Sequence, residues 1–528
     1  MQPVVVIAEE ISAAGMAVLE ASATVVTAVG APRETLLEML GDAAALVVRS
    51  ATRVDAELLA AAPRLRVVGR AGTGVDNIDL EAATAAGVLV VNAPTSNSVS
   101  AAEHTMALLL GQARRIPEAD RSMRTGAWDR SRLQGVELHG KVLGLIGLGR
   151  IGTLVAQRAA AFGMRVIVYD PYVGQDRARR IGVEPAASLD DVLSQADFIT
   201  IHLPRTRDTE GLIGPEAIAA MKPGVRIVNA SRGGIVDEDA LVDGLRSGRV
   251  AGAALDVFAR EPLERSPLVE FPQVVLTPHL GASTAEAQDK AGVDVAVAVA
   301  AALRGELVAS AVNVDFAGEV HEEVAPFLPV AEHLGATFVA LAGRLPGHLV
   351  LRVEGQLAGH PGRPLVLAAL KGALAAVSDA PVSFVNAPRL AEARGIAVTE
   401  ESTSEVSDYV SVLRVRGTVG GEPISVSGTT IGRKGPVLVE ALDHEIELPF
   451  SPHMLLLVND DVPGMIGRVG SALGGLGVNI DNMVVGQSFV TGQRAMMGLN
   501  LDRRLTDPEV EGLRGLSGVA RAWYLDRA

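Results

Sequence analysis

Three side chains in the middle of the chain are of types that can move a proton beside an anionic substrate. His279 stands in Thr-Pro-His-Leu-Gly, and an imidazole titrates near neutral pH. Glu261 could hydrogen-bond one ring nitrogen, fix its tautomer and favour the imidazolium. Arg232, in Asn-Ala-Ser-Arg-Gly-Gly, could hold a carboxylate by two parallel charge-assisted bonds. Each residue alone also fits a structural role, since a His beside Pro can cap a strand and surface Arg and Glu are usually solvated.

A glycine-rich segment comes before these residues in the chain. Gly147-Leu-Gly149-Arg-Ile-Gly152 directly follows an apolar run at 142–146 and opens an Ala-rich helix, and Asp170 ends the next strand-like run. In this context backbone amides can approach a pyrophosphate at the positive helix N-terminus, and Asp170 can accept hydrogen bonds from both ribose hydroxyls. The pattern predicts NAD rather than NADP, because a carboxylate repels a 2′-phosphate. Three arginines downstream could still accommodate that phosphate if the loop folds back, namely Arg177, Arg179 and Arg180.

The elements that must position these groups follow a β–α rhythm. Short β-branched runs alternate with Ala/Leu/Glu-rich helical patterns, first at 4–8, 46–49, 65–69 and 88–91, and then at 141–146, 165–169, 198–202, 226–229, 252–256 and 274–277. This rhythm predicts an α/β protein with doubly wound parallel sheets. Since ligands of such sheets bind beyond the carboxyl ends of the strands, Arg232, Glu261 and His279 should converge there.

The order of these elements predicts four domains. A helix from about 98 to 116 leads into the second α/β unit, and an Ala/Val-rich helix after 283 should return the chain to the first. We therefore expect a discontinuous substrate-binding domain, 1–97 and 285–315, with a Rossmann cofactor domain inserted at 98–284. An α+β intervening domain should follow at 316–450, and a βαββαβ unit at 451–528.

Composition excludes several classes of protein. The net charge of −15 would repel nucleic acid and anionic membranes, so an anionic substrate must meet a local cluster of arginines. The sequence contains no Cys, which rules out disulfides, thiolate nucleophiles and Cys-ligated zinc. The apolar runs near the start and at 293–303 are too short for a signal peptide or a membrane helix. We expect a cytoplasmic protein with neither nucleic-acid nor membrane partners.

The motifs resemble those of the D-isomer-specific 2-hydroxyacid dehydrogenases, over about residues 1–315. The match rests on the glycine-rich segment with Asp170, the Arg232 motif, Leu255-Asp-Val-Phe with Glu261, and Thr277-Pro-His-Leu-Gly-Ala-Ser-Thr. The resemblance implies that Arg232, Glu261 and His279 are catalytic. It also implies cofactor contacts at Arg150, Ile151, Ala230, Ser231, Asp256, Gly281 and Ala282.

The first unit carries a more specific resemblance. Val48-Arg-Ser-Ala-Thr and Gly69-Arg-Ala-Gly-Thr-Gly-Val-Asp-Asn, with Asn97, are similar to substrate-binding segments of family members that oxidise 3-phosphoglycerate. The resemblance implies substrate contacts at Arg49, Arg70, Gly72 and Asn97, with the two arginines on the 3-phosphate and Arg130 or Arg132 adding charge. Surface arginines without a ligand remain the alternative.

The last unit resembles an ACT domain, which binds amino acids at subunit interfaces. Asp461-Val-Pro-Gly-Met and Gly477-Val-Asn-Ile carry the match and imply an effector site at Asp461 and Asn479, with L-serine as the effector. Asn459 departs from the pattern, since relatives often place His or Tyr there. Residues 316–450 resemble the intervening domain of the longer family members.

Together these features predict oxidation of 3-phospho-D-glycerate to 3-phosphohydroxypyruvate with NAD, the first step of L-serine biosynthesis, under serine feedback. Two alternatives stay open: another NAD-dependent 2-hydroxy acid dehydrogenase, such as a 2-oxoglutarate or glyoxylate reductase, and a non-catalytic NAD-sensing regulator. The intact Arg232, Glu261 and His279 argue against the regulator. We expect a homotetramer, and the sequence indicates no metal site.

Overall fold

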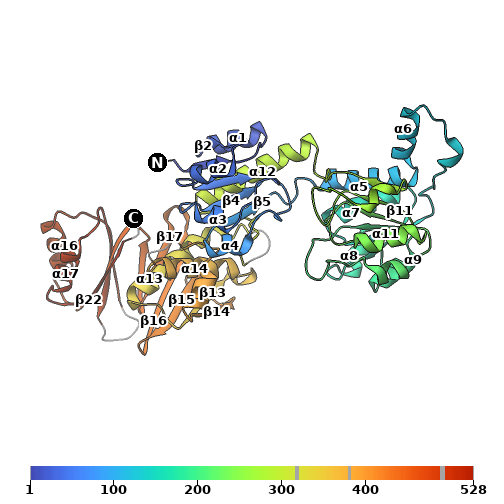
Figure 1. Ribbon diagram of the computed structural model, residues 1–528. Coiled ribbons are helices and arrows are strands. Elements are labelled where there is room, and N and C mark those ends of the chain that lie inside the picture. Colours follow the sequence, from blue (N-terminus) through green and yellow to red (C-terminus); the bar gives the residue numbers. More distant parts are fainter. Residues whose placement is uncertain (1, 316–319, 379–381, 488–493, 527–528) are drawn as a thin grey trace.

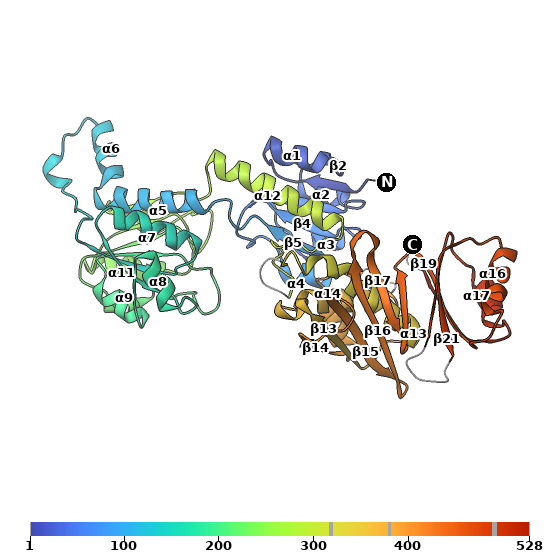
Figure 2. The same ribbon diagram turned by 180° about the vertical axis from the view of Figure 1, so that it is seen from behind.

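Four β-sheets organise the chain, each covered by helices from its own part of the sequence (Figure 1). The computed structural model describes residues 2–315, 320–378, 382–487 and 494–526. The first sheet, drawn in blue, lies between the second unit, in cyan and green, and the third, in yellow and orange. The fourth unit, in red, lies at the far end from the second, as Figure 2 shows from behind.

The first sheet has five parallel strands in the order β2-β1-β3-β4-β5. Its strands are β1 (Val4–Ile7), β2 (Thr24–Thr27), β3 (Ala45–Val48), β4 (Val67–Arg70) and β5 (Leu89–Asn92). The connecting helices are α1 (Ala13–Glu20), α2 (Arg33–Met39), α3 (Ala56–Ala60) and α4 (Leu80–Ala85). Valines fill both faces of β3 and β4, as a parallel sheet covered on both sides requires.

The second sheet has seven parallel strands in the order β12-β11-β10-β9-β6-β7-β8. They are β6 (Val142–Ile146), β7 (Arg165–Tyr169), β8 (Glu184–Pro185), β9 (Phe198–Ile201), β10 (Val225–Asn229), β11 (Val250–Leu255) and β12 (Val274–Leu276). The helices are α7 (Arg150–Ala161), α8 (Gln175–Ile181), α9 (Leu189–Gln195), α10 (Pro215–Ala220) and α11 (Glu238–Arg246), with the 3-10 turn η2 (Pro267–Glu270). Chain order reverses between β6 and β9, which creates the crevice where such sheets bind nucleotides.

Two long helices carry the chain between these sheets. α5 (Ser98–Ala113) packs on α7 and β11 of the second sheet, and α12 (Ala285–Leu303) packs on α1, β4 and β5 of the first. Their N-terminal ends meet, where the Ser100 and Thr284 hydroxyls are 2.8 Å apart. Beyond α5, α6 (Ile116–Arg124) and the 3-10 turn η1 (Arg130–Arg132) belong to an arm that extends from the second unit (Figure 1).

The third sheet combines one parallel pair with an antiparallel meander, in the order β14-β13-β15-β16-β17-β18. Its strands are β13 (His348–Gly355), β14 (Ala397–Thr403), β15 (Ser411–Val419), β16 (Glu422–Ile431), β17 (Gly435–Ala441) and β18 (His444–Pro449). Its helices are α13 (Leu328–Ala342), α14 (Arg363–Ala375) and α15 (Ala387–Ala393), with the 3-10 turns η3 (Ala325–Phe327), η4 (Gln356–Gly359) and η5 (Gly432–Lys434).

The segment 325–342 is apolar and long enough to cross a membrane, by length and composition alone. It contains η3 and α13, and α13 packs on α14 and on β15 and β16, so its apolar residues form the core of the third unit. Its composition is thus explained by packing within the protein.

The fourth sheet is antiparallel, in the order β20-β21-β19-β22, and follows a βαββαβ sequence. Its elements are β19 (His453–Asn459), α16 (Met465–Gly475), β20 (Ile480–Gly486), β21 (Ala495–Leu501), α17 (Asp507–Arg514) and β22 (Val519–Asp526). β19 is apolar on both faces: Leu455 and Leu457 join the core beneath the two helices, whereas Met454 and Leu456 join the core of the third unit. The third and fourth units are therefore packed together.

Candidate active site

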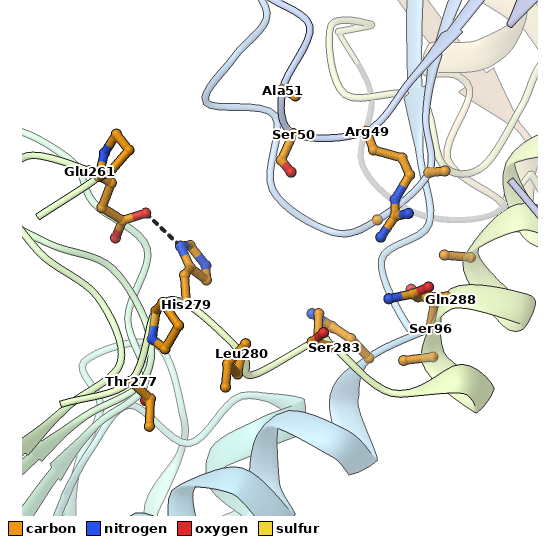
Figure 3. Close-up of a pocket in the computed structure, with 18 of the residues that line it drawn as sticks. Arg49, Ser50, Ala51, Ser96, Glu261, Thr277, His279, Leu280, Ser283 and Gln288 are labelled. Atoms are coloured by element: carbon orange, nitrogen blue, oxygen red, sulfur yellow. Dashed lines mark hydrogen bonds and ion pairs between the residues drawn. The ribbon is translucent and has the colours of Figure 1, made fainter. Parts of the chain in front are cut away.

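The predicted acid–base pair is present at the carboxyl edge of the second sheet. His279 follows β12, and its Nδ1 lies 2.7 Å from Glu261 Oε2 (Figure 3). The other carboxylate oxygen, Glu261 Oε1, accepts a hydrogen bond from the Phe258 amide at 2.9 Å. With Nδ1–H donated to Glu261, the lone pair of Nε2 can accept a proton from a substrate.

Electrostatics shift the pKa values of this pair in opposite directions. The hydrogen bond to Glu261 raises the pKa of His279 above its ordinary value, against desolvation, and the charge of Asp256 adds to the rise. Burial alone would raise the pKa of Glu261, but the bonds from His279 and the Phe258 amide hold it below its usual range. Glu261 therefore stays ionised while His279 titrates.

The loop that carries His279 is built on Asp256, which was predicted to contact the cofactor. Its carboxylate is fully buried and accepts hydrogen bonds from Thr277 Oγ1 at 2.6 Å, the Leu280 amide at 2.8 Å and the Gly281 amide at 2.9 Å. The Asp256 carbonyl accepts from the His279 amide at 2.9 Å. His279 itself has a φ of 55°, a backbone conformation that L residues rarely adopt. Asp256 thus holds His279 in a conformation that local sequence would not favour.

Sequence reasoning missed a second histidine at this point. His104, on α5, places Nε2 3.1 Å from Asp256 Oδ1 and 3.2 Å from Thr277 Oγ1. Burial alone would raise the pKa of Asp256, but the bonds from His104, Thr277 and Leu280 lower it, so the buried carboxylate is ionised and compensated. The helix carries other polar residues, such as Glu103 and Thr105 beside it, so the sequence did not single out His104.

Arg232 follows β10, as predicted, and extends toward the first unit. Its Nη1 donates to the Ser231 carbonyl at 2.8 Å, and its Nε lies 3.3 Å from Asp76 of the loop after β4. The preceding turn is closed by Asn229, which donates to the Arg232 carbonyl at 2.9 Å. Because Asp76 is a largely exposed carboxylate, a substrate carboxylate could replace it on Arg232.

A cleft of about 1070 Å³ joins the acid–base pair to the first unit. Four residues predicted to bind substrate line it together with His279 and Glu261, and these are Arg49, Arg70, Gly72 and Asn97. Figure 3 shows Arg49 across the gap from His279, with the Ser50 hydroxyl pointing toward the same space. Residues about 200 positions apart in sequence thus face one another.

The arginines of this cleft concentrate positive charge. Burial and the neighbouring charge of Arg232 lower the pKa of Arg70, and its Nε is buried without a hydrogen-bond partner among the described residues. Gly72 makes room for the guanidinium, since a Cβ there would lie 1.6 Å from Arg70 Nη1. The cluster is suited to bind a strongly charged anion.

Two further residues missed by sequence reasoning hold the Arg49 loop. Glu9, which follows β1, accepts from the amides of Arg49 at 2.9 Å, Ala51 at 3.1 Å and Thr52 at 2.9 Å. Asn77 donates to the Arg49 carbonyl at 3.0 Å and to the Thr52 carbonyl at 2.6 Å. The position of Arg49 is therefore set by its backbone.

Arg132 does not join the others within this chain. It lies in η1 on the arm beyond α6, with 76% of its side chain exposed, and is not among the residues that line the cleft. The predicted extra charge from Arg132 is therefore not brought to this cleft by the fold of one chain.

The glycine-rich turn has the geometry of a dinucleotide loop. Gly147 has a φ of 97°, and a Cβ there would lie 2.5 Å from the His202 carbonyl oxygen. A Cβ on Gly152 would lie 2.2 Å from the Gly147 carbonyl oxygen, so the helix approaches the turn closely. Gly149 caps α7 and faces open space, which leaves the helix N-terminus accessible to a pyrophosphate.

Asp170 lies beside a second cavity of about 250 Å³ next to this turn. Its Oδ2 accepts from the Leu148 amide at 2.7 Å and its Oδ1 from the Tyr172 amide at 2.9 Å, which directs the carboxylate into the position a ribose requires. The apolar walls suit an adenine ring, with Leu148, Val168, Val173, Ala178 and Pro185 among the lining residues. The residues present fit an adenine dinucleotide.

The remaining predicted cofactor residues lie along the same edge. Arg150 and Ile151 open α7; Ala230 and Ser231 follow β10, where Ser231 bonds Asn229 Oδ1; and Gly281 and Ala282 follow His279. His202, beside Gly147, does not compete as a base, because desolvation lowers its pKa to about 4. Among the described residues, only His279 combines a raised pKa with a place in the large cleft.

The predicted effector residues lie in the fourth unit, away from the cleft. Asp461 is exposed in the loop between β19 and α16, and Asn479 is exposed just before β20, where it donates to Asp481 at 3.1 Å. Asn459, at the end of β19, is buried and donates to the Asp460 carbonyl at 2.9 Å.

The fold, dinucleotide loop and acid–base pair define an NAD-dependent oxidoreductase, and comparison with known proteins agrees. Residues 106–281 match the model of the D-isomer specific 2-hydroxyacid dehydrogenase NAD binding domain, and residues 323–441 match the D-3-phosphoglycerate dehydrogenase intervening domain.

Relatives extend the match over nearly the whole chain. The chain is 50% identical over 506 residues to D-3-phosphoglycerate dehydrogenase of Mycobacterium leprae, covering 95% of each chain, and 40% identical over 521 residues to that of a Synechocystis species, covering 98% and 94%. A solved glyoxylate reductase from Paecilomyes thermophila is 30% identical, with a TM-score of 0.55, covering 59% of this chain and 98% of its own. The chain belongs to the D-3-phosphoglycerate dehydrogenase family of 2-hydroxyacid dehydrogenases.

Proposed function

We propose that the protein oxidises 3-phospho-D-glycerate to 3-phosphohydroxypyruvate as the first step of L-serine biosynthesis. The observation that carries this proposal is one cleft that holds both the His279–Glu261 pair and the Arg49 and Arg70 side chains. A simple 2-hydroxy acid needs one cation for its carboxylate, which Arg232 supplies. The two additional arginines, one with an unpartnered Nε, suit a second and more highly charged group such as a phosphate.

The residues of this chain divide the reaction between them. Arg232 exchanges Asp76 for the substrate carboxylate and orients C2, while Arg49 and Arg70 hold the phosphate. His279 Nε2 accepts the C2 hydroxyl proton as the C2–H bond breaks, and Glu261 stabilises the resulting imidazolium. NAD, when bound, accepts the hydride from C2. The chain passes between the two units at the N-terminal ends of α5 and α12, where the Ser100 and Thr284 hydroxyls meet. Movement at these two passages allows the units to close over the substrate and exclude water.

The direct test follows NADH oxidation by the purified full-length protein. 3-Phosphohydroxypyruvate is compared with glyoxylate and 2-oxoglutarate, and wild type with Arg70→Gln. We expect a strong preference for the phosphorylated substrate that Arg70→Gln reduces selectively. Equal turnover of the unphosphorylated acids would point to another 2-hydroxyacid dehydrogenase, and no turnover of any substrate would support an NAD-sensing regulator.

We also propose that the fourth unit is an ACT domain that takes L-serine as a feedback effector in a homotetramer. Its βαββαβ order places the Asp461 carboxylate just before α16, where it can meet the effector ammonium, and Asn479 before β20. Serine added to the same assay should inhibit, and Asp461→Ala should relieve inhibition without changing uninhibited turnover. Serine insensitivity of the wild type would reject this part alone.

A further inference from the structure

A cluster of two histidines and a glutamate lies outside the active-site cleft, where the chain enters the third unit. His321 and Glu323 come just before η3, and His360 follows η4. One ligand atom from each residue lies within 4.8 Å of the others. His360 Nε2 is 2.9 Å from Glu323 Oε2, and the two imidazole rings stack with centroids 4.1 Å apart at 28°.

The chemistry of the cluster favours a cation. Each neutral imidazole presents one ring-nitrogen lone pair, and the Glu323 carboxylate presents two acceptor oxygens. Arg363, three residues after His360, is already paired with Asp315. Imidazole nitrogens with a carboxylate oxygen are the donors preferred by zinc and neighbouring first-row divalent ions.

The backbone holds the three ligand side chains in place, and the Glu323 amide also donates to His321 Nδ1 at 3.3 Å, so His321 must give up this bond or bind the ion through Nε2. The turn from 321 is closed by the Val324 and Ala325 amides, which donate to the His321 carbonyl at 2.9 and 3.0 Å, and the His360 amide donates to the Leu357 carbonyl at 3.0 Å. Bond lengths of about 2.0–2.1 Å would place the ligand atoms roughly 3.4 Å apart, so atoms that now lie within 4.8 Å of one another need to close by at most about 1.4 Å. His321 and Glu323 are exposed and can adjust, and water can complete the coordination.

We propose that His321, Glu323 and His360 bind a divalent ion of the zinc type. Bound there, the ion would fasten the segment entering α13 to the turn between β13 and α14. The sequence gives little indication of the site, because Glu323 and His360 are 37 residues apart and fall in no metal-binding motif. The proposal does not depend on the reaction catalysed.

The test is equilibrium dialysis of the full-length protein against Zn²⁺, with Co²⁺ absorption as a coordination readout. Wild type should bind one ion with His-type coordination, and His360→Gln and Glu323→Gln should each weaken binding on the order of tenfold or more. His348→Gln is the matched control, because this exposed histidine bonds Thr399 outside the cluster. His279→Gln tests whether the active-site pair is the true site.

The outcomes separate cleanly. Loss of the ion in the His360 and Glu323 variants, with retention in His348→Gln and His279→Gln, supports the site. No binding by wild type, unchanged binding in His360→Gln, or loss only in His279→Gln would each overturn it. Circular dichroism and thermal unfolding without metal verify that every variant is folded.

Discussion

The side chains on the two sides of the cleft differ in how far they are paired with partners within the protein. On the side of the second sheet, His279, Glu261 and Asp256 are all paired, and the buried carboxylate of Asp256 has several donors. On the side of the first sheet, Arg49 and Arg70 lie near Arg232, so three positive charges are close together. Arg70 Nε also has no hydrogen-bond partner among the described residues. In the proposed mechanism the proton-transfer side is therefore preorganised, whereas the anion-binding side would gain its balancing charge from the substrate.

The largest expected effect comes from removing the base on the preorganised side. His279→Ala should lower kcat by about 10²–10⁴-fold, because no other described group in the cleft is placed to accept the proton. NADH affinity, followed by fluorescence titration, should be largely kept, since the dinucleotide loop is separate. Near-normal turnover would remove His279 from the mechanism.

The anion-binding side should respond through binding instead. Arg70→Gln removes charge-assisted bonds worth about 1.5–3 kcal/mol, so KM for the phosphorylated substrate should rise roughly 10- to 150-fold. Turnover at saturation should change much less. Steady-state kinetics with phosphorylated and unphosphorylated substrates compare the two, and an equal loss on both would contradict a phosphate contact.

The pH profile tests how Glu261 prepares the base. Oxidation requires neutral His279, so it falls as pH drops through the pKa of His279, which Glu261 raises. In Glu261→Gln the raising contact is weakened, that pKa falls, and the acid limb of kcat/KM for oxidation should move to lower pH. A limb that stays in place, or moves to higher pH, would show that Glu261 does not set this pKa.

The smallest expected effect concerns the support beneath the base. His104→Gln should lower kcat several-fold, because Asp256 keeps Thr277 and two amides but loses its histidine partner. KM should be unchanged, as should NADH binding. His348→Gln, on the distant third sheet, is the matched control. A rise in KM with unchanged kcat would show that His104 acts on substrate binding rather than on the His279 loop.

Sequence reasoning anticipated much of the fold because the strong signals are local. Buried β-branched runs marked β3, β4 and β6, whereas β2 was missed because two of its four residues are exposed and none is fully buried. Strand β14, at the edge of the third sheet, was missed for the same reason, since its sequence is polar and partly exposed. Edge strands depend on pairing with a neighbour, which local composition does not reveal.

The sequence by itself determined the dinucleotide site, because a strand, a glycine turn, a helix and an acidic residue meet within about 30 positions. It also identified Arg232, Glu261 and His279 through their motifs. Only the tertiary structure decided that Asp256 is buried under the His279 loop, that His104 supports it, and that Arg132 lies outside the cleft. These facts depend on contacts between segments far apart in the chain, whose distances are fixed by packing and not by local sequence.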